Sequence, residues 1–173
     1  RKVATICIGG GMAFTFLAAR GYGTGRSLLE EDKVSFAREM MERAKSNGVE
    51  ILLPEDILLA QSFDSDTYRV AGAAEIKENE MGLDIGPATV HLFEKRVRSA
   101  KTVLWNGPMG VFERAAYAGG TRGVGEALKE CTISGGTTVI GGGDTAAAAK
   151  TLGFASDVSH VSTGGGASLE FFE

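Results

Sequence analysis

The chain has 173 residues, 43% of them hydrophobic, which predicts one well-packed domain. Its 18 basic and 22 acidic residues give a formal net charge of −4 with no concentrated basic stretch, which argues against a nucleic-acid partner. No apolar run approaches the roughly 20 residues that cross a bilayer, and two cysteines are too few for a disulfide framework. We therefore expect a soluble, cytoplasmic protein with no membrane partner.

Short apolar runs alternate with helical patterns from the beginning of the chain. Residues 3–8 predict a strand that ends in three glycines, after which a helix is expected from Met12. Ser27 and Glu30 have the spacing of a capping box, which predicts the start of a helix that continues to Gly48. The first part of the chain thus predicts a strand, a glycine turn and two helices.

The remaining elements predict an α/β fold. Residues 61–81 are polar with short extended pieces, and Pro87 is placed at the first position of a helix that ends near Ala100. Because strands that alternate with helices are joined by right-handed crossovers, we expect a Rossmann-like three-layer domain with a mostly parallel sheet and helices on both faces. The other expected elements are strands at 50–53, 57–60, 102–105, 137–140 and 158–162, helices at 121–131 and 145–152, and a final helix after 164–166.

Four strand-to-helix turns are rich in glycine, and three of them contain the triplets 9–11, 141–143 and 164–166. In an open parallel sheet, ligands bind beyond the carboxyl ends of the strands, where such turns meet. Glycine lets backbone amides converge on an anion, and the positive end of the following helix favours phosphate. The four turns together predict a phosphate-binding site.

Side chains near these turns suggest how a nucleotide is bound, although each has a structural alternative. Asp144 and Thr145 are placed to meet Mg²⁺ and a phosphate oxygen, or Asp144 is a helix cap. Glu113 is placed to accept hydrogen bonds from ribose hydroxyls, or is an ordinary exposed glutamate. Asn106 contacts the nucleotide, or closes a turn before Pro108.

Two other classes of nucleotide site fit the sequence less well. No Walker-type phosphate loop is present. A dinucleotide fingerprint occurs at Gly141-x-Gly143-x-x-Ala146, but the acid expected about 20 residues later is replaced by Ser162 and Thr163. A nicotinamide-dependent dehydrogenase is therefore the second hypothesis, and a non-catalytic nucleotide-binding module is the third.

Five segments, in this order, resemble the carboxyl-terminal, nucleotide-binding domain of phosphoglycerate kinase. They are GGGMAFTFL at 9–17, GLDIGP at 82–87, WNGPMGVFE at 105–113, GGGDT at 141–145 and HVSTGGGASLE at 160–170. The resemblance extends over essentially all of residues 1–173. Membership of this family implies phosphoryl transfer between the acyl phosphate of 1,3-bisphosphoglycerate and Mg·ADP, which yields 3-phosphoglycerate and ATP in glycolysis. The implied enzyme class is a phosphotransferase with a carboxyl group as acceptor.

The resemblance also implies roles for individual residues. The base and sugar of ADP or ATP would be held by Gly9, Gly10, Gly82, Leu83, Pro108 and Val111, with Glu113 on the ribose. The phosphates would be bound by Asn106, Gly142, Gly143 and Thr145, and the metal by Asp144. The amides of Gly164, Gly165 and Gly166 would stabilise the transferring phosphoryl group and are the predicted catalytic residues.

Relative to the family, the chain is expected to be incomplete at both ends. The family's domain begins with a further strand carrying a Gly-Ala-Lys run and a second lysine, and it ends in a Gly-Lys-Leu-Pro-Gly tail. The family's amino-terminal domain, which binds phosphoglycerate, has no counterpart in residues 1–173. We therefore expect a monomeric parent enzyme with a hinge, and no turnover by this chain alone.

Overall fold

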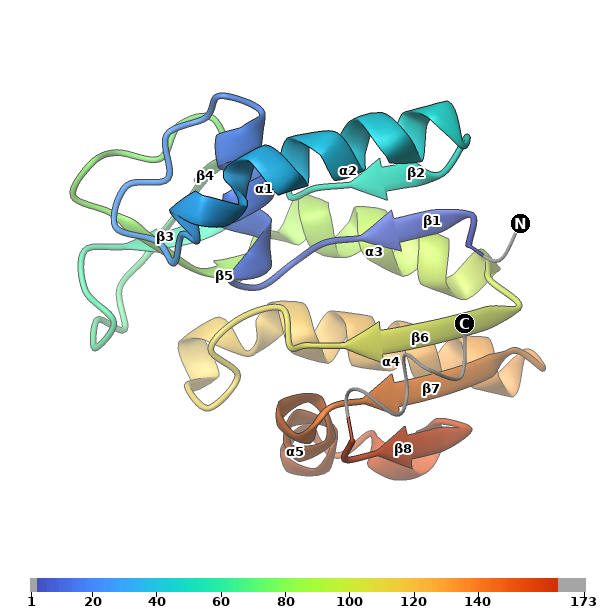
Figure 1. Ribbon diagram of the computed structural model, residues 1–173. Coiled ribbons are helices and arrows are strands. Elements are labelled where there is room, and N and C mark those ends of the chain that lie inside the picture. The colour runs from blue at the N-terminus through green and yellow to red at the C-terminus, as the bar shows by residue number, and fades with distance from the viewer. Residues whose placement is uncertain (1–2, 165–173) are drawn as a thin grey trace.

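The computed structural model describes residues 3–164, and the structural statements below refer to that range. Its central layer contains parallel strands: β1 (Thr5–Cys7), β2 (Glu50–Leu52), β6 (Thr102–Asn106), β7 (Thr137–Gly141) and β8 (His160–Ser162). β1 pairs with β2, and β6, β7 and β8 pair in that order. Figure 1 shows all these arrows pointing the same way, but within the described range no hydrogen-bonded pairing joins β1 to β6.

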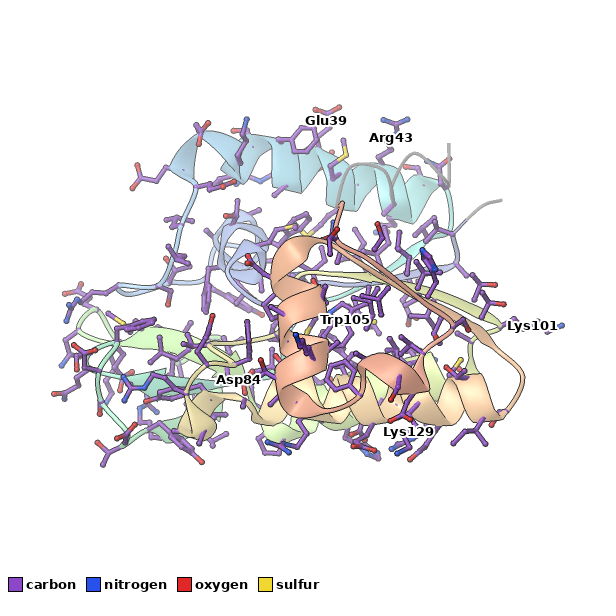
Figure 2. The ribbon with its side chains drawn as sticks, turned by 90° about the horizontal axis from the view of Figure 1, so that it is seen from below. Glu39, Arg43, Asp84, Lys101, Trp105 and Lys129 are labelled. Atoms are coloured by element: carbon purple, nitrogen blue, oxygen red, sulfur yellow. The ribbon has the colours of Figure 1, made fainter. Side chains whose placement is uncertain are left out.

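Helices cover both faces of this layer, as Figures 1 and 2 show. The helices on one face are α3 (Pro87–Ser99) and α4 (Gly119–Ile133), and those on the other are α1 (Met12–Ala19) and α2 (Val34–Ser46). A further helix, α5 (Gly143–Leu152), follows β7. Phe93, Trp105 and Ile140 belong to the core between β6, β7 and the helices α3 and α4. The predicted three-layer α/β arrangement is confirmed.

The start of α3 shows how a neighbouring strand supports a helix. Gly86 is the N-cap and Pro87 occupies the first turn, as the sequence predicts. The Asp56 carboxylate accepts hydrogen bonds from the backbone N–H of Ala88 at 3.0 Å and of Thr89 at 2.8 Å. Because these amides have no partner within the helix, a side chain from another strand stabilises the start of α3.

The middle of the chain is more regular than its sequence indicates. The strands β3 (Asp56–Ala60), β4 (Arg69–Gly72) and β5 (Met81–Ile85) form an antiparallel sheet in the order β4-β3-β5. The sequence predicted short extended pieces here but not that they pair into a sheet. Polar side chains of this region also bind each other. Arg69 donates two hydrogen bonds to the Glu80 carboxylate, at 2.7 and 2.8 Å, and holds the pKa of Glu80 at about 2.

The capping box predicted at Ser27 was wrong. A 3₁₀ turn (Glu31–Lys33) precedes α2, whose N-cap is Lys33 and has no side-chain cap. The Ser27 hydroxyl instead accepts a 2.9 Å hydrogen bond from the Gly82 N–H. That contact joins the segment before α2 to β5.

Several boundaries differ slightly from the predicted ones. α4 begins at Gly119, and a 3₁₀ turn (Ala155–Asp157) comes before β8. A further 3₁₀ turn (Ala115–Tyr117) precedes α4. The final helix expected after 164–166 lies outside the described residues. Within residues 3–164, no helix is long and apolar enough to span a bilayer.

Candidate nucleotide site

The carboxyl ends of β1 and β6 and the whole of β5 border a cavity of about 1210 Å³. The segments that line it are separated by long stretches of sequence, which the fold brings together. Eight of the twelve residues predicted to bind a nucleotide line this cavity: Gly9, Gly10, Gly82, Leu83, Asn106, Pro108, Val111 and Asp144. The predicted residues that do not line it are Glu113, Gly142, Gly143 and Thr145.

The turn after β1 packs directly against the chain that follows β6. The Gly10 N–H donates a 3.1 Å hydrogen bond to the carbonyl oxygen of Met109. Gly10 has φ +62°, and a Cβ at this position would lie 2.6 Å from the carbonyl oxygen of Pro108. A Cβ on Gly9 would lie 2.4 Å from the Met109 sulfur. Glycine is therefore required at position 10, where two walls of the cavity meet at backbone distance, whereas the atom close to position 9 belongs to the flexible Met109 side chain.

The end of β6 is held by Trp105 and by the first turn of α5. Trp105 is buried, stacks on Phe154 with ring centroids 5.8 Å apart, and donates a 2.6 Å hydrogen bond from Nε1 to the Gly107 carbonyl. The Gly107 N–H donates a 2.7 Å hydrogen bond to the Thr145 hydroxyl oxygen. Thr145 is 1% exposed, so its hydroxyl positions the turn at the end of β6.

The first turn of α5 leaves the Asp144 carboxylate available to a ligand. The N-cap is Gly142, with φ +92°, and no side chain caps the helix. The cap interpretation of Asp144 is therefore wrong, because its exposed side chain borders the cavity instead. The first intrahelical hydrogen bond runs from Ala146 N–H to the Gly142 carbonyl, so helix geometry leaves the amides of residues 143–145 without an intrahelical acceptor.

Two predicted groups lie at the margin of the described site. Glu113 is exposed and does not line the cavity. Its neighbour Arg114 donates hydrogen bonds to the Phe63 carbonyl, to the Asp64 carbonyl at 2.7 Å and to the Asp66 carboxylate. Of the predicted catalytic glycines, Gly164 follows β8 and donates a 3.3 Å hydrogen bond to the Ser162 hydroxyl. Gly165 and Gly166 lie outside the described residues.

Sequence reasoning missed Asp84, a carboxyl that also borders the cavity and is 4% exposed. It accepts hydrogen bonds from the backbone N–H of Ile85 at 2.9 Å and of Gly120 at 2.7 Å. Burial raises the pKa of Asp84 to about 7, although both N–H bonds oppose that shift. The available signal was an acidic residue between the apolar residues Leu83 and Ile85 of the family segment GLDIGP.

Other cavity residues that sequence reasoning did not assign come from two loops. Arg26 and Ser27 precede α2, and Phe63 lies between β3 and β4. Arg26 donates a 2.9 Å hydrogen bond to the Gln61 carbonyl, which joins these loops. Within residues 3–164, no group of three or more His, Cys, Asp or Glu side chains is placed to hold a metal ion.

Comparisons with known proteins agree on one family. The family model for phosphoglycerate kinase matches residues 1–173. The phosphoglycerate kinase of Clostridium novyi (strain NT) is 57% identical over 173 residues, covering 99% of this chain and 43% of that protein. The protein of the same name from Chloroherpeton thalassium is 53% identical, with 99% and 44% covered. This chain thus spans less than half the length of these curated relatives.

Solved structures give the same result. The phosphoglycerate kinase of Coxiella burnetii matches with a TM-score of 0.91 at 38% sequence identity, covering 98% of this chain and 44% of that one. The phosphoglycerate kinase of Pyrococcus horikoshii OT3 matches with a TM-score of 0.77 at 28% identity, covering 97% and 42%.

Proposed function

This chain belongs to the phosphoglycerate kinase family, and we propose that it is the nucleotide-binding part of an enzyme that transfers a phosphoryl group between 1,3-bisphosphoglycerate and Mg·ADP. The products would be 3-phosphoglycerate and ATP. The observation that carries this proposal is the convergence of eight predicted nucleotide residues on one cavity. Most of them lie at or beyond the ends of the parallel strands β1, β6 and β7, a position typical of nucleotide sites in α/β folds, and Gly82 and Leu83 lie within β5.

The walls of the cavity suggest the orientation of the nucleotide. Leu83, Val111 and the glycine turn after β1 supply an apolar, closely packed surface for the base and sugar. Asn106 and Asp144 line the cavity, and the first turn of α5, which contains Asp144, has backbone N–H groups without an intrahelical acceptor that could meet the phosphates. We therefore place the phosphates toward α5, where the helix dipole favours negative charge.

Asp144 fits the role of the residue that holds Mg²⁺. Its carboxylate is exposed, borders the cavity and is not engaged as a helix cap. Mg²⁺ in nucleotide sites takes one or two protein carboxylates and completes its shell with phosphate oxygens and water, so a larger protein cluster is not required. When bound, the ion neutralises negative charge on the phosphates. Asp84 fits this role less well than Asp144, because it is 4% exposed and each of its oxygens already accepts a backbone N–H bond.

The dehydrogenase hypothesis gains little support. Its glycine fingerprint does lie at the start of α5. A dehydrogenase would need a carboxylate at the end of β8 to bind the cofactor ribose, but Ser162 and Thr163 occupy this place. The Ser162 hydroxyl donates a 3.3 Å hydrogen bond to the Gly164 carbonyl.

We extend the proposal to the remaining features of the parent enzyme. 3-Phosphoglycerate or 1,3-bisphosphoglycerate would bind in the part of the relatives that lies beyond this chain, and residues 1–173 would form most of the nucleotide-binding domain. The parent would act as a cytoplasmic monomer. Because phosphoryl transfer requires two substrates to be held in line, this chain alone should lack turnover.

Calorimetric titrations with Mg·ADP and with NADH test the proposal on the full-length protein that carries this chain. We expect binding of Mg·ADP and no binding of NADH. A coupled assay with 3-phosphoglycerate should show turnover for the full-length protein but not for the isolated chain. Binding of NADH without binding of Mg·ADP would favour the dehydrogenase, and Mg·ADP binding by a full-length protein without turnover would favour the non-catalytic module.

A further inference from the structure

Asp84 joins β5 to the start of α4. Gly120 is the second residue of α4, and its N–H is one of those that a helix leaves without an internal acceptor. The N-cap, Ala118, offers no side-chain oxygen. The Asp84 carboxylate accepts the Gly120 N–H at 2.7 Å and therefore caps α4 from a strand 36 residues earlier. Figure 2 shows Asp84 inside the molecule, whereas Lys101 and Lys129 lie at its periphery.

The space around this carboxylate is provided by two glycines. A Cβ on Gly110 would lie 2.4 Å from Asp84 Oδ1, and a Cβ on Gly120 would lie 2.3 Å from the same oxygen. These glycines lie near the two ends of the segment that leads from β6 into α4. The carboxylate therefore contacts the segment at both places, and any larger residue at either glycine would displace it.

The segment between β6 and α4 forms one wall of the nucleotide cavity through residues 107–111. The Val111 N–H donates a 2.9 Å hydrogen bond to the Leu83 carbonyl, next to Asp84. The Met109 N–H donates a 3.1 Å hydrogen bond to the Thr121 hydroxyl, at the residue after Gly120. The position of this wall thus depends on the contacts of β5 with the start of α4.

We propose that Asp84 is a positioning residue for the nucleotide, whose ionised carboxylate fixes the segment 107–120 in the shape that the base and sugar require. The inference rests on the proposed nucleotide-binding function. A carboxylate accepts both N–H bonds, whereas a protonated carboxyl presents one oxygen as a donor toward an N–H group. Protonation should therefore release one of the two contacts.

The charged and titratable side chains on the elements that surround Asp84 are exposed or bound to other groups, and His91 on α3 is among the exposed ones. Asp56 on β3 binds the start of α3, Arg114 binds residues 63–66, and Tyr117 donates to the Ser65 carbonyl. The side chains of Glu113 and of Arg122 on α4 are exposed. Within residues 3–164, no basic side chain forms an ion pair with Asp84, whose pKa is governed by burial and by the two N–H bonds.

Adenosine is the appropriate probe, because a nucleotide's terminal phosphate itself titrates near pH 6 and would obscure the protein's response. Adenosine affinity is measured by calorimetry on the full-length protein between about pH 8 and about pH 6, a range that brackets the raised pKa of Asp84. We expect the wild type to bind about fivefold or more weakly at the acid end, a coupling of ordinary size. A wild-type affinity that does not change with pH would overturn the inference.

Two variants separate positioning from a general structural role. Asp84→Asn should bind adenosine weakly at every pH, because its NH2 group would replace one of the two oxygens that accept N–H bonds. Thr121→Val, the matched control, removes a contact of the same segment without a titrating group and should keep the pH dependence. A pH dependence retained by Asp84→Asn would contradict the proposal.

One further measurement decides the case if Asp84→Asn does not fold. The carbon-13 shift of the Asp84 carboxyl in the wild type should titrate with the same midpoint as the adenosine affinity, and different midpoints would refute the coupling. Failure of the proposed function gives a different result, because the wild type would then bind neither adenosine nor Mg·ADP at any pH.

Discussion

The hydroxyl oxygen of Thr145 accepts a 2.7 Å hydrogen bond from the N–H of Gly107, a residue 38 positions earlier in the chain. This bond connects the first turn of α5 to the turn after β6, and both border the proposed phosphate site. Because the hydroxyl accepts this bond, its own O–H can still donate, and the predicted contact of Thr145 with phosphate stays a prediction. Independently of that contact, Thr145 positions the turn at Gly107.

Replacement of Thr145 by valine should destabilise the protein by about 1–3 kcal/mol, because a buried N–H group loses its acceptor. The affinity for Mg·ADP should fall as well, since the turn at Gly107 is no longer held. Denaturant unfolding and calorimetry measure the two effects. Thr145→Ser keeps the hydroxyl and is the matched control. Valine and serine variants of equal stability would show that the hydrogen bond is not important.

Asp144→Asn should weaken the Mg²⁺-dependent part of nucleotide binding and leave stability almost unchanged, because the side chain is exposed and caps no helix. A neutral amide loses most of the attraction to the cation. Calorimetric titration of ADP with and without Mg²⁺ measures the difference. Asp32→Asn, a change at a 77% exposed side chain outside the cavity, is the control. If Mg²⁺ still strengthens ADP binding by the wild-type factor, Asp144 is not the metal ligand.

Gly10→Ala should reduce both stability and nucleotide affinity. The new Cβ would lie 2.6 Å from the Pro108 carbonyl oxygen and would also be strained at φ +62°. Gly21→Ala separates these causes, because Gly21 has φ +89° with no atom within 4 Å of the added Cβ. The control should lose about 1–2 kcal/mol of unfolding free energy and no affinity. Equal affinity losses in both variants would rule out the close approach as the cause.

Asp84 should also make stability depend on pH. Its pKa is about 7 in the folded protein against 3.8 as its ordinary value, so between these limits the folded state binds more protons than the unfolded state. The unfolding free energy should therefore fall as pH rises from about 4 to about 7, by at most about 4 kcal/mol. Asp84→Asn should remove this decrease when urea unfolding is followed across that range. A wild-type slope of the opposite sign would contradict the assignment.

Glu80 provides an internal comparison for that experiment. Arg69 lowers the pKa of Glu80 from 4.5 to about 2, so the stability it contributes is present above 4.5 and is lost as pH falls toward 2. Glu80 and Asp84 thus change the unfolding free energy with opposite signs as pH rises, and they do so in different pH ranges. Asp84→Asn should leave the acid limb below about pH 4 unchanged.

The sequence alone predicted the parts of this protein that depend on neighbouring residues. Short apolar runs followed by glycine triplets indicated strand, turn and helix units, and the order of these units predicted the layered α/β fold. Because parallel strands end at one edge of a sheet, the same pattern predicted that the turns at Gly9, Asn106 and Asp144 would meet there, and the family resemblance added Gly82. The cavity confirms that they do.

Tertiary structure decided the contacts that join distant parts of the chain. The Ser27 hydroxyl binds Gly82 instead of capping its own helix, and the polar residues Arg69 and Glu80 pair within an antiparallel sheet. Asp84 reaches Gly120 across 36 residues and loses its water on burial, which changes its pKa. Local propensities extend over only a few residues, whereas hydrogen-bond partners and desolvation depend on which segments the whole fold brings together.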